Sequence, residues 1–129
     1  MKKTKILLIS ANIFKIPYPV YPLGISYLKT YFESNRPDFE VKLFDFNLQS
    51  SNELITELNS FLPDFVGISM RNVDSVNSLN SESFIGHYKK IIETVKQNST
   101  AVTVAGGSGF SIFPEKLYNE LGTDFGIYG

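Results

Sequence analysis

A glycine-rich turn, Gly106-Gly107-Ser108-Gly109, is the stretch of this sequence whose residue types best suit ligand binding. It follows the apolar, largely β-branched run 102–105, which predicts a buried strand. Because glycine has no Cβ, the turn lets another group approach the backbone closely. That group is either a ligand or a neighbouring part of the chain in a tight strand-to-helix turn, and we favour a ligand. A ligand there would lie at the carboxyl end of a strand, where open parallel sheets bind their ligands.

Other polar residues follow further predicted strands and could contact the same ligand. Ser69 closes an apolar run, and Arg71, Asn72 and Asp74 follow it on a loop rich in Asn and Ser. Asp45 ends another run of alternating character. From the sequence alone, each of these groups could equally serve a local turn or face solvent. For Asp45 we slightly favour solvent.

The sequence offers little for catalysis or metal binding. It has no cysteine, which excludes thiol catalysis, disulfides and cysteine-ligated metals within these residues. Its one histidine, His87, falls at the edge of an apolar helical stripe, where we expect a structural role. No carboxylate pair or nucleophile with a nearby base stands out. We therefore expect no catalytic residue and no metal ligand.

Composition and known fingerprints narrow the partners. The 129 residues suit one domain, and a formal net charge of −1 with mixed signs does not suggest a nucleic-acid partner. No apolar run approaches the roughly 20 residues of a membrane span, so we expect a cytoplasmic protein. The Gly-x-Gly-x-x-Gly motif of dinucleotide-binding Rossmann folds should follow the first strand, but residues 11–22 form a proline-rich loop there, and no Walker lysine motif occurs. A nicotinamide or nucleoside-triphosphate site is therefore disfavoured.

Strand and helix alternate five times along the chain. Apolar or alternating runs predict strands at 5–10, 40–45, 64–70, 102–105 and 125–128. Helical spacing predicts helices at 22–34, 54–62 and 84–95, and the first carries Leu23, Tyr27, Leu28, Tyr31 and Phe32 at the spacing of an apolar face. We expect a fourth helix to start at Pro114-Glu115. Right-handed crossovers then give an α/β fold: a three-layer, doubly wound (Rossmann-like or flavodoxin-like) five-stranded parallel sheet in the order 2-1-3-4-5.

Four stretches occur in a characteristic order. They are Tyr21-Pro22-Leu23-Gly24-Ile25-Ser26-Tyr27-Leu28, Pro63-Asp64-Phe65-Val66-Gly67-Ile68-Ser69, Val104-Ala105-Gly106-Gly107 and Asp124-Phe125-Gly126-Ile127-Tyr128-Gly129. Together they resemble the cobalamin-binding domain that precedes the radical S-adenosylmethionine (SAM) domain in vitamin-B12-dependent radical enzymes. On this resemblance, we expect residues 1–129 to be such a domain at the N-terminal end of a longer radical SAM protein.

The resemblance implies where the cofactor lies. The corrin ring would lie over the carboxyl ends of the strands, and its nucleotide tail would enter the cleft beside the first strand. Ser69 matches the serine of the family's Ser-x-Leu motif, with Arg71 in place of the leucine, and Gly106 and Gly107 match the Gly-Gly pair beside the base of the tail. We therefore expect cobalamin contacts from Asn12, Tyr21, Ser69, Arg71, Asn72, Gly106, Gly107, Ser108 and Gly109.

One departure concerns the cobalt. Classical cobalamin domains carry Asp-x-His-x-x-Gly after the first strand, whose histidine ligates cobalt, whereas residues 11–21 contain no histidine. Either cobalt is bound without a histidine ligand, or cobalamin is not bound. The resemblance places SAM and a [4Fe–4S] cluster, held by a Cys-x3-Cys-x2-Cys motif, in a downstream barrel domain that would be the partner in cis. Full-length chemistry would be methyl transfer or a radical rearrangement.

Other function classes share this fold. A flavodoxin-like module would bind a flavin, and a receiver-like module would bind a partner protein. Residues 10–12 do not supply the acidic pair of a receiver, and the proline-rich loop that follows is a poor substitute for the Ser/Thr-rich phosphate loop of a flavodoxin. Half of a glycosyltransferase is a third alternative, which a second α/β domain downstream would reveal.

Overall fold

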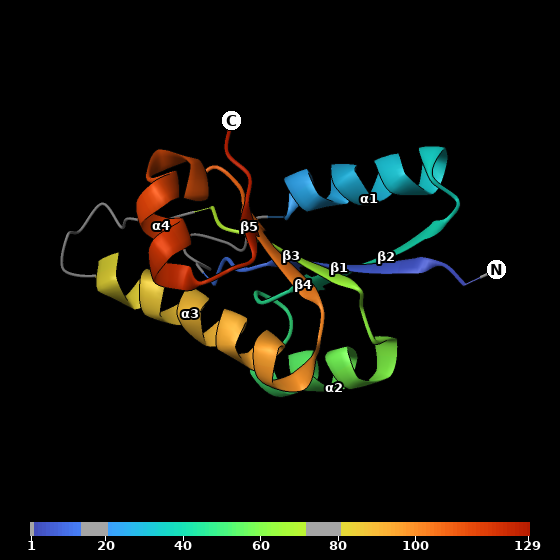
Figure 1. Cartoon of the computed structure of the whole chain (residues 1–129), viewed down its shortest axis with the longest axis horizontal. Coiled ribbons are helices and arrows are strands. Elements are labelled where there is room, and N and C mark those ends of the chain that lie inside the picture. Colours follow the sequence, from blue (N-terminus) through green and yellow to red (C-terminus); the bar gives the residue numbers. More distant parts are fainter. Residues whose placement is uncertain (1, 14–20, 72–80) are drawn as a thin grey trace.

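Strands and helices alternate along the chain in the computed structural model, which describes residues 2–13, 21–71 and 81–129 (Figure 1). The elements are β1 (Thr4–Ser10), α1 (Leu23–Asn35), β2 (Phe39–Asp45), α2 (Ser51–Phe61), β3 (Phe65–Ser69), α3 (Ser81–Asn98), β4 (Val102–Gly106), the 3₁₀ helix η2 (Phe110–Ile112), α4 (Pro114–Leu121) and β5 (Phe125–Gly126).

The strands form one parallel sheet in the order β2-β1-β3-β4-β5, which confirms the predicted fold class and strand order. The predicted fifth strand was too long, because β5 covers only Phe125 and Gly126. One more hydrogen bond follows, from the Ile127 amide to the Ala105 carbonyl at 2.8 Å. Beyond it β5 has no ladder partner, since β4 ends at Gly106 and the chain turns at Gly107, where φ is 102°.

The two faces of the sheet are covered unequally. In Figure 1, α2 and α3 lie on one side of the sheet and α1 on the other. The contacts run from α2 to α3 and from α3 to α4. The main core therefore lies on the α2–α3–α4 side, and its strand residues include Leu7, Ile9, Val66 and Ile68. A smaller cluster of Ile6, Leu8, Ile25 and Val41 lies under α1.

The apolar face predicted for α1 is mostly exposed. Ile25 is the buried residue of this helix and Phe32 is half-buried, whereas Tyr27 is 68% exposed. Leu23, Leu28 and Tyr31 are exposed as well. The helix packs on β1 and β2, the two strands at one side of the sheet. The α1-side face of β3 and β4 consequently has no helix over it in the part of the chain that the structure describes.

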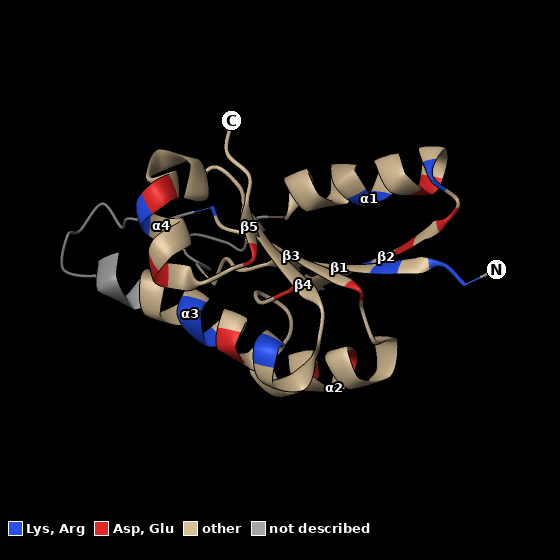
Figure 2. Cartoon of the chain, in the orientation of Figure 1, with Lys and Arg blue, Asp and Glu red and all other residues tan. Residues whose placement is uncertain are grey.

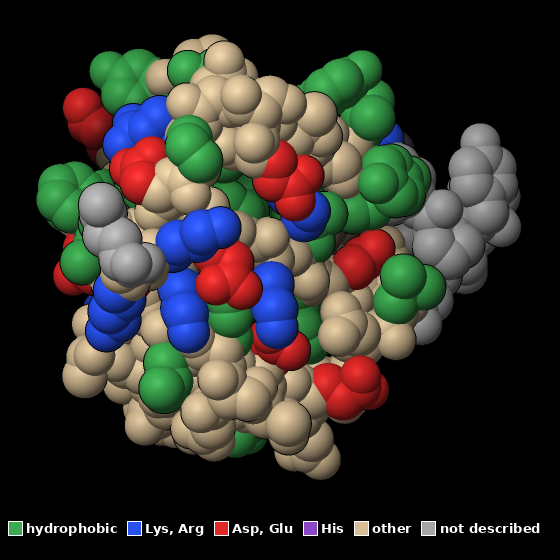
Figure 3. Space-filling model, turned by 90° about the vertical axis from the view of Figure 1, so that its right-hand side faces the viewer, with side chains coloured by type: hydrophobic (Ala, Val, Ile, Leu, Met, Phe, Trp, Pro, Cys, Tyr) green, Lys and Arg blue, Asp and Glu red, His purple; other side chains and the backbone are tan. Residues whose placement is uncertain are grey.

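Lys, Arg, Asp and Glu residues occur along α1, α3 and α4 and at the amino-terminal end of the sheet (Figure 2). The view onto that end shows positive and negative side chains interspersed (Figure 3). Two of the ion pairs are Arg36–Asp38 at 2.8 Å and Lys42–Glu57 at 3.2 Å, both partly exposed. Among the described residues, no helix combines the length and the apolar character needed to cross a bilayer.

Candidate functional site

The candidate site is built on the last row of the three inner strands. Ser10 of β1 is in register with Ser69 of β3, and Ser69 is in register with Gly106 of β4. The three residues point to the α1 side, opposite the buried neighbours Ile9, Ile68 and Ala105, because successive residues of a strand face opposite ways. Two cavities adjoin this row.

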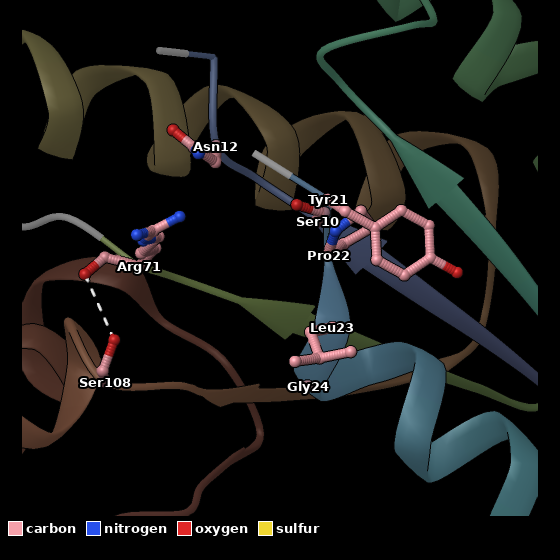
Figure 4. Close-up of a pocket in the computed structure, with 8 residues that line it drawn as sticks. All are labelled: Ser10, Asn12, Tyr21, Pro22, Leu23, Gly24, Arg71 and Ser108. Carbon is pink, nitrogen blue, oxygen red and sulfur yellow. Dashed lines mark hydrogen bonds between the residues drawn. The ribbon is translucent and has the colours of Figure 1, made fainter. Parts of the chain in front are cut away.

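The first cavity, here called the carboxyl-end pocket, has a volume of about 570 Å³. It is lined by Ser10, Asn12, Tyr21, Pro22, Leu23, Gly24, Arg71 and Ser108, which come from the exit of β1, the start of α1 and the turns after β3 and β4 (Figure 4). Arg71 is the one charged side chain among them. A guanidinium offers five N–H donors and no acceptor, so Arg71 can bind amide or phosphate oxygens but cannot ligate a metal.

The second cavity, here called the sheet groove, has a volume of about 320 Å³ and occupies the uncovered face of the sheet beside α1. Its lining is Ile6, Leu8, Ile25, Leu28, Phe32, Phe65, Gly67, Ile68, Ser69, Val104, Ala105, Gly106, Gly107 and Ile127. The hydroxyl of Ser69 is the only polar side-chain group in that set. The groove therefore suits a flat apolar group that presents one polar edge to Ser69.

The glycines at the end of β4 and in the turn after it, Gly106, Gly107 and Gly109, have different neighbours at the position of a Cβ. A Cβ on Gly107 would lie 2.6 Å from the Met70 carbonyl oxygen, and one on Gly109 would lie 2.9 Å from the Arg71 carbonyl oxygen. The exit of β3 is thus the group that approaches both residues. A Cβ on Gly106 would meet only Ile127, at 3.5 Å or more. Of the three, Gly106 alone is not required as glycine by its protein neighbours.

Hydrogen bonds hold the turn after β4 against the exit of β3. The Gly109 amide donates to the Met70 carbonyl at 2.8 Å, and the Met70 amide donates to the Gly106 carbonyl at 2.8 Å. The Ser108 hydroxyl donates to the Arg71 carbonyl at 3.4 Å (Figure 4). These bonds place Arg71 and Ser108 on one wall of the carboxyl-end pocket.

The structure brings most of the predicted contact residues together around the two cavities. The carboxyl-end pocket includes Asn12, Tyr21, Arg71 and Ser108. The sheet groove includes Ser69, Gly106 and Gly107. Gly109 lines neither cavity and is buried beneath the exit of β3. Asn72 and Asp74 lie outside the described residues.

Asp45 lies on the same row of the sheet, in register with Ser10, but lines neither cavity. Its Oδ1 accepts a hydrogen bond from the Asn47 amide at 2.9 Å, and it is half-buried. It serves the turn after β2, so our preference for solvent was only partly right.

Sequence reasoning missed several lining residues. Ser10 closes the first apolar run as Ser69 closes the third, and that parallel could have identified it. Gly67 was quoted only as part of a motif. A Cβ on Gly67 would lie 2.8 Å from Leu8 Cδ2, so this glycine makes room for Leu8 in the groove wall. A glycine inside an apolar strand is the available signal for such a close approach.

His87 lines neither of the two cavities, and its side chain contacts the exit of β1. Its Nε2 lies 3.0 Å from the Ala11 carbonyl oxygen, and it is half-buried. Burial lowers the pKa of His87, an effect that the bond to Ala11 opposes and the charge of Lys90 reinforces. Burial thus favours the neutral imidazole.

Comparison of the whole sequence with known protein families identifies the family of this chain. Residues 9–129 match the family model described as the B12 binding domain. The chain belongs to the B12-binding domain family. A curated relative, the tryptophan 2-C-methyltransferase of Streptomyces laurentii, is 30% identical over 130 residues, which cover 100% of this chain and 21% of the relative. This B12-binding domain therefore spans about a fifth of the length of that relative.

Several solved structures share the fold of this chain. The radical SAM methyltransferase TsrM from Kitasatospora setae, with cobalamin and a [4Fe–4S] cluster bound, is 28% identical with a TM-score of 0.82 over 98% of this chain and 22% of its own. TsrM with tryptophan and a SAM analogue bound gives a TM-score of 0.85 at the same identity, over 98% of this chain and 23% of its own. OxsB, a cobalamin-dependent SAM radical enzyme with aqua-cobalamin and SAM bound, shares the fold at 18% identity and a TM-score of 0.69, over 91% of this chain and 16% of its own.

Proposed function

We propose that this B12-binding domain holds cobalamin across the row Ser10–Ser69–Gly106, with the corrin ring at the carboxyl-end pocket and the base of the nucleotide tail in the sheet groove. The observation that carries the proposal is that a pocket lined in part by Asn12, Arg71 and Ser108 and an apolar groove meet at one row of the sheet. Cobalamin has this same division, since its corrin carries polar amide arms and its tail ends in a flat base.

The residues present fit the cofactor chemically. Asn12, Arg71 and Ser108 offer amide, guanidinium and hydroxyl groups to the amide arms and the tail phosphate. Ser69 can bond a ring nitrogen of the base. Gly106 lines the groove and has no Cβ, which lets the base lie against the backbone of β4.

We propose further that no imidazole of residues 1–129 ligates the cobalt. The sequence has one histidine. The nitrogen that His87 directs toward the exit of β1 already bonds the Ala11 carbonyl. The base of the tail, placed in the groove, would not ligate the cobalt either, so the bound form would be base-off.

Bound cobalamin would supply a methyl carrier, and this domain would orient it and shield it from water. We propose that the domain works in cis with a downstream radical SAM barrel that holds SAM and a [4Fe–4S] cluster. In support, TsrM is a radical SAM methyltransferase that binds cobalamin and such a cluster, and the matched part is 22% of its chain. Methyl transfer is the reaction class that the relatives named above favour over a radical rearrangement. Such a cluster suits the reducing cytoplasm, where we expect the protein to work.

The test is an absorbance titration of the purified chain with hydroxocobalamin and with methylcobalamin, followed by gel filtration. We expect the corrinoid to co-elute with protein and to show a base-off spectrum. After reduction to cob(II)alamin, the electron paramagnetic resonance spectrum should lack the splitting that a nitrogen ligand produces. Nitrogen splitting that disappears in His87→Phe would contradict the ligand set.

Two variants sharpen the titration. Ser69→Ala removes the one polar side chain among the described residues that line the groove, and it should weaken binding several-fold, because a hydrogen bond to the base is lost. Ser34→Ala, exposed on α1 and away from both cavities, should bind as the unaltered chain does. If neither corrinoid is retained at concentrations up to about a millimolar, equivalent to roughly −4 kcal/mol, these residues alone do not form the site.

A further inference from the structure

The single histidine links α3 to the exit of β1, two segments 76 residues apart in the sequence. His87 Nε2 and the Ala11 carbonyl oxygen lie 3.0 Å apart. A carbonyl can only accept a hydrogen bond, so Nε2 carries the proton and donates it. Burial favours the neutral imidazole, and its tautomer with the proton on Nε2 makes this bond.

The ring itself is held by aromatic neighbours. Phe46, from the turn after β2, meets His87 edge to face, with 5.4 Å between ring centroids and 87° between planes. Tyr88, which is buried, lies beside it at 5.9 Å with planes tilted by 47°. Contacts on two sides fix the ring plane and hence the direction in which Nε2 donates.

The residue that receives this bond is tied on both sides. The Ala11 amide donates to the Ser69 carbonyl at 3.0 Å, while its carbonyl accepts from His87. Ala11 is fully buried in the main core. The next residue is Asn12, whose side chain lines the carboxyl-end pocket although the residue is only 6% exposed. The direction in which the chain leaves Ala11 thus determines where the Asn12 amide lies.

We propose that His87 is a positioning residue, which fixes the exit of β1 through the Ala11 carbonyl and so presents the Asn12 side chain to the amide arms of the corrinoid. The proposal rests on the proposed function for its ligand, but not for the contact itself. His87 acts through Asn12 and touches no cofactor atom.

One test needs no ligand. The ¹⁵N-labelled chain reports the side-chain NH₂ signals of Asn12 by NMR, assigned by their loss in Asn12→Ala. His87→Phe keeps an aromatic ring against Phe46 but removes the donor, and His87→Gln keeps an N–H donor. We expect the Asn12 signals to shift and broaden in His87→Phe and to stay near their original positions in His87→Gln. Unchanged Asn12 signals in a folded His87→Phe would overturn the proposal. Should that variant not fold, His87→Leu takes its place.

The second test is a double-mutant cycle on hydroxocobalamin affinity. We expect His87→Phe to raise Kd about five- to tenfold, the effect of one positioning hydrogen bond, and His87→Gln to restore most of the affinity. In an Asn12→Ala background, His87→Phe should cause no further loss, because the residue through which it acts is gone. Equal losses in both backgrounds would overturn the proposal. Failure of the unaltered chain to bind would contradict the proposed function alone, and the NMR comparison would still decide the role of His87.

Discussion

Individual residues show how far a glycine pattern can be interpreted. The sequence predicts that something approaches the turn after β4, and in the structure the exit of β3 approaches Gly107 and Gly109. That exit lies more than 30 residues earlier in the chain, so no local pattern could reveal it. Gly106 is different, because a Cβ there would make only ordinary contacts with Ile127, and the space of the sheet groove adjoins it. Whether a ligand fills that space stays a prediction.

Two neighbouring glycines therefore give a matched pair of variants. Gly106→Ala should change the free energy of unfolding by less than about 1 kcal/mol, since its Cβ would meet only ordinary contacts. The same methyl group would occupy the groove and should weaken hydroxocobalamin binding by roughly tenfold or more. Gly107→Ala should destabilise the fold by about 1–3 kcal/mol, because it forces a side chain onto a φ of 102° and against the Met70 carbonyl.

Urea unfolding and a corrinoid titration on the two variants measure these effects separately. The interpretation of Gly106 fails if Gly106→Ala binds hydroxocobalamin as tightly as the unaltered chain. The interpretation of Gly107 fails if its alanine variant unfolds at the same urea concentration.

At the scale of elements, periodicity predicts what forms but not what covers it. Apolar or alternating runs identified the five strands, and helical spacing identified α1, α2 and α3, while α4 was predicted from its start at Pro114. The same spacing on α1 did not predict burial, because burial depends on the width of sheet in front of the helix. α1 packs on β1 and β2, and its outer side chains, Tyr27 and Tyr31 among them, stay exposed.

The attachment of β5 provides a prediction at this scale. Asp124 Oδ2 accepts hydrogen bonds from the Thr103 amide at 2.8 Å and the Thr103 hydroxyl at 3.0 Å, which tie the start of β5 to β4. Asp124→Ala should therefore lower the free energy of unfolding by about 1 kcal/mol at pH 7. Glu120→Ala, exposed on α4, is the control and should have no measurable effect.

The pH dependence of that effect follows from the carboxylate. The Thr103 amide, and then its hydroxyl, lower the pKa of Asp124 below its ordinary value. The unfolded chain therefore takes up the proton at a higher pH than the folded chain does. The stabilisation is present above about pH 4 and is lost as the pH falls through the lower pKa of the folded state. Urea unfolding of both chains should show the difference shrinking toward about pH 2, and a difference that grows on acidification would contradict this.

The whole molecule shows why the sheet was easier to predict than the site. Strand order follows from local patterns and crossover handedness, which the sequence contains directly. The site depends on residues that meet only after folding: Ser10, Ser69 and Gly106 belong to three strands and become neighbours through register. The resemblance to cobalamin domains identified two of them, and Ser10 emerged only from the structure.

Ligand specificity is the property of the whole molecule that distinguishes cobalamin from the flavin alternative. A ligand that binds the folded chain but not the unfolded chain raises the free energy of unfolding. At a ligand concentration ten times the Kd the increase is about 1.4 kcal/mol, or roughly 5 °C in Tm for a chain of this size. Hydroxocobalamin should produce this shift and flavin mononucleotide should produce none, because the proline-rich sequence of residues 11–22, after β1, is a poor substitute for the Ser/Thr-rich phosphate loop of a flavodoxin. Gly106→Ala should reduce the corrinoid shift at the same ligand concentration. A shift with the flavin but not with corrinoids would favour a flavodoxin-like role. If the corrinoid shift in Gly106→Ala is as large as in the unaltered chain, cobalamin is still supported as the ligand, but the placement of its tail in the groove is contradicted.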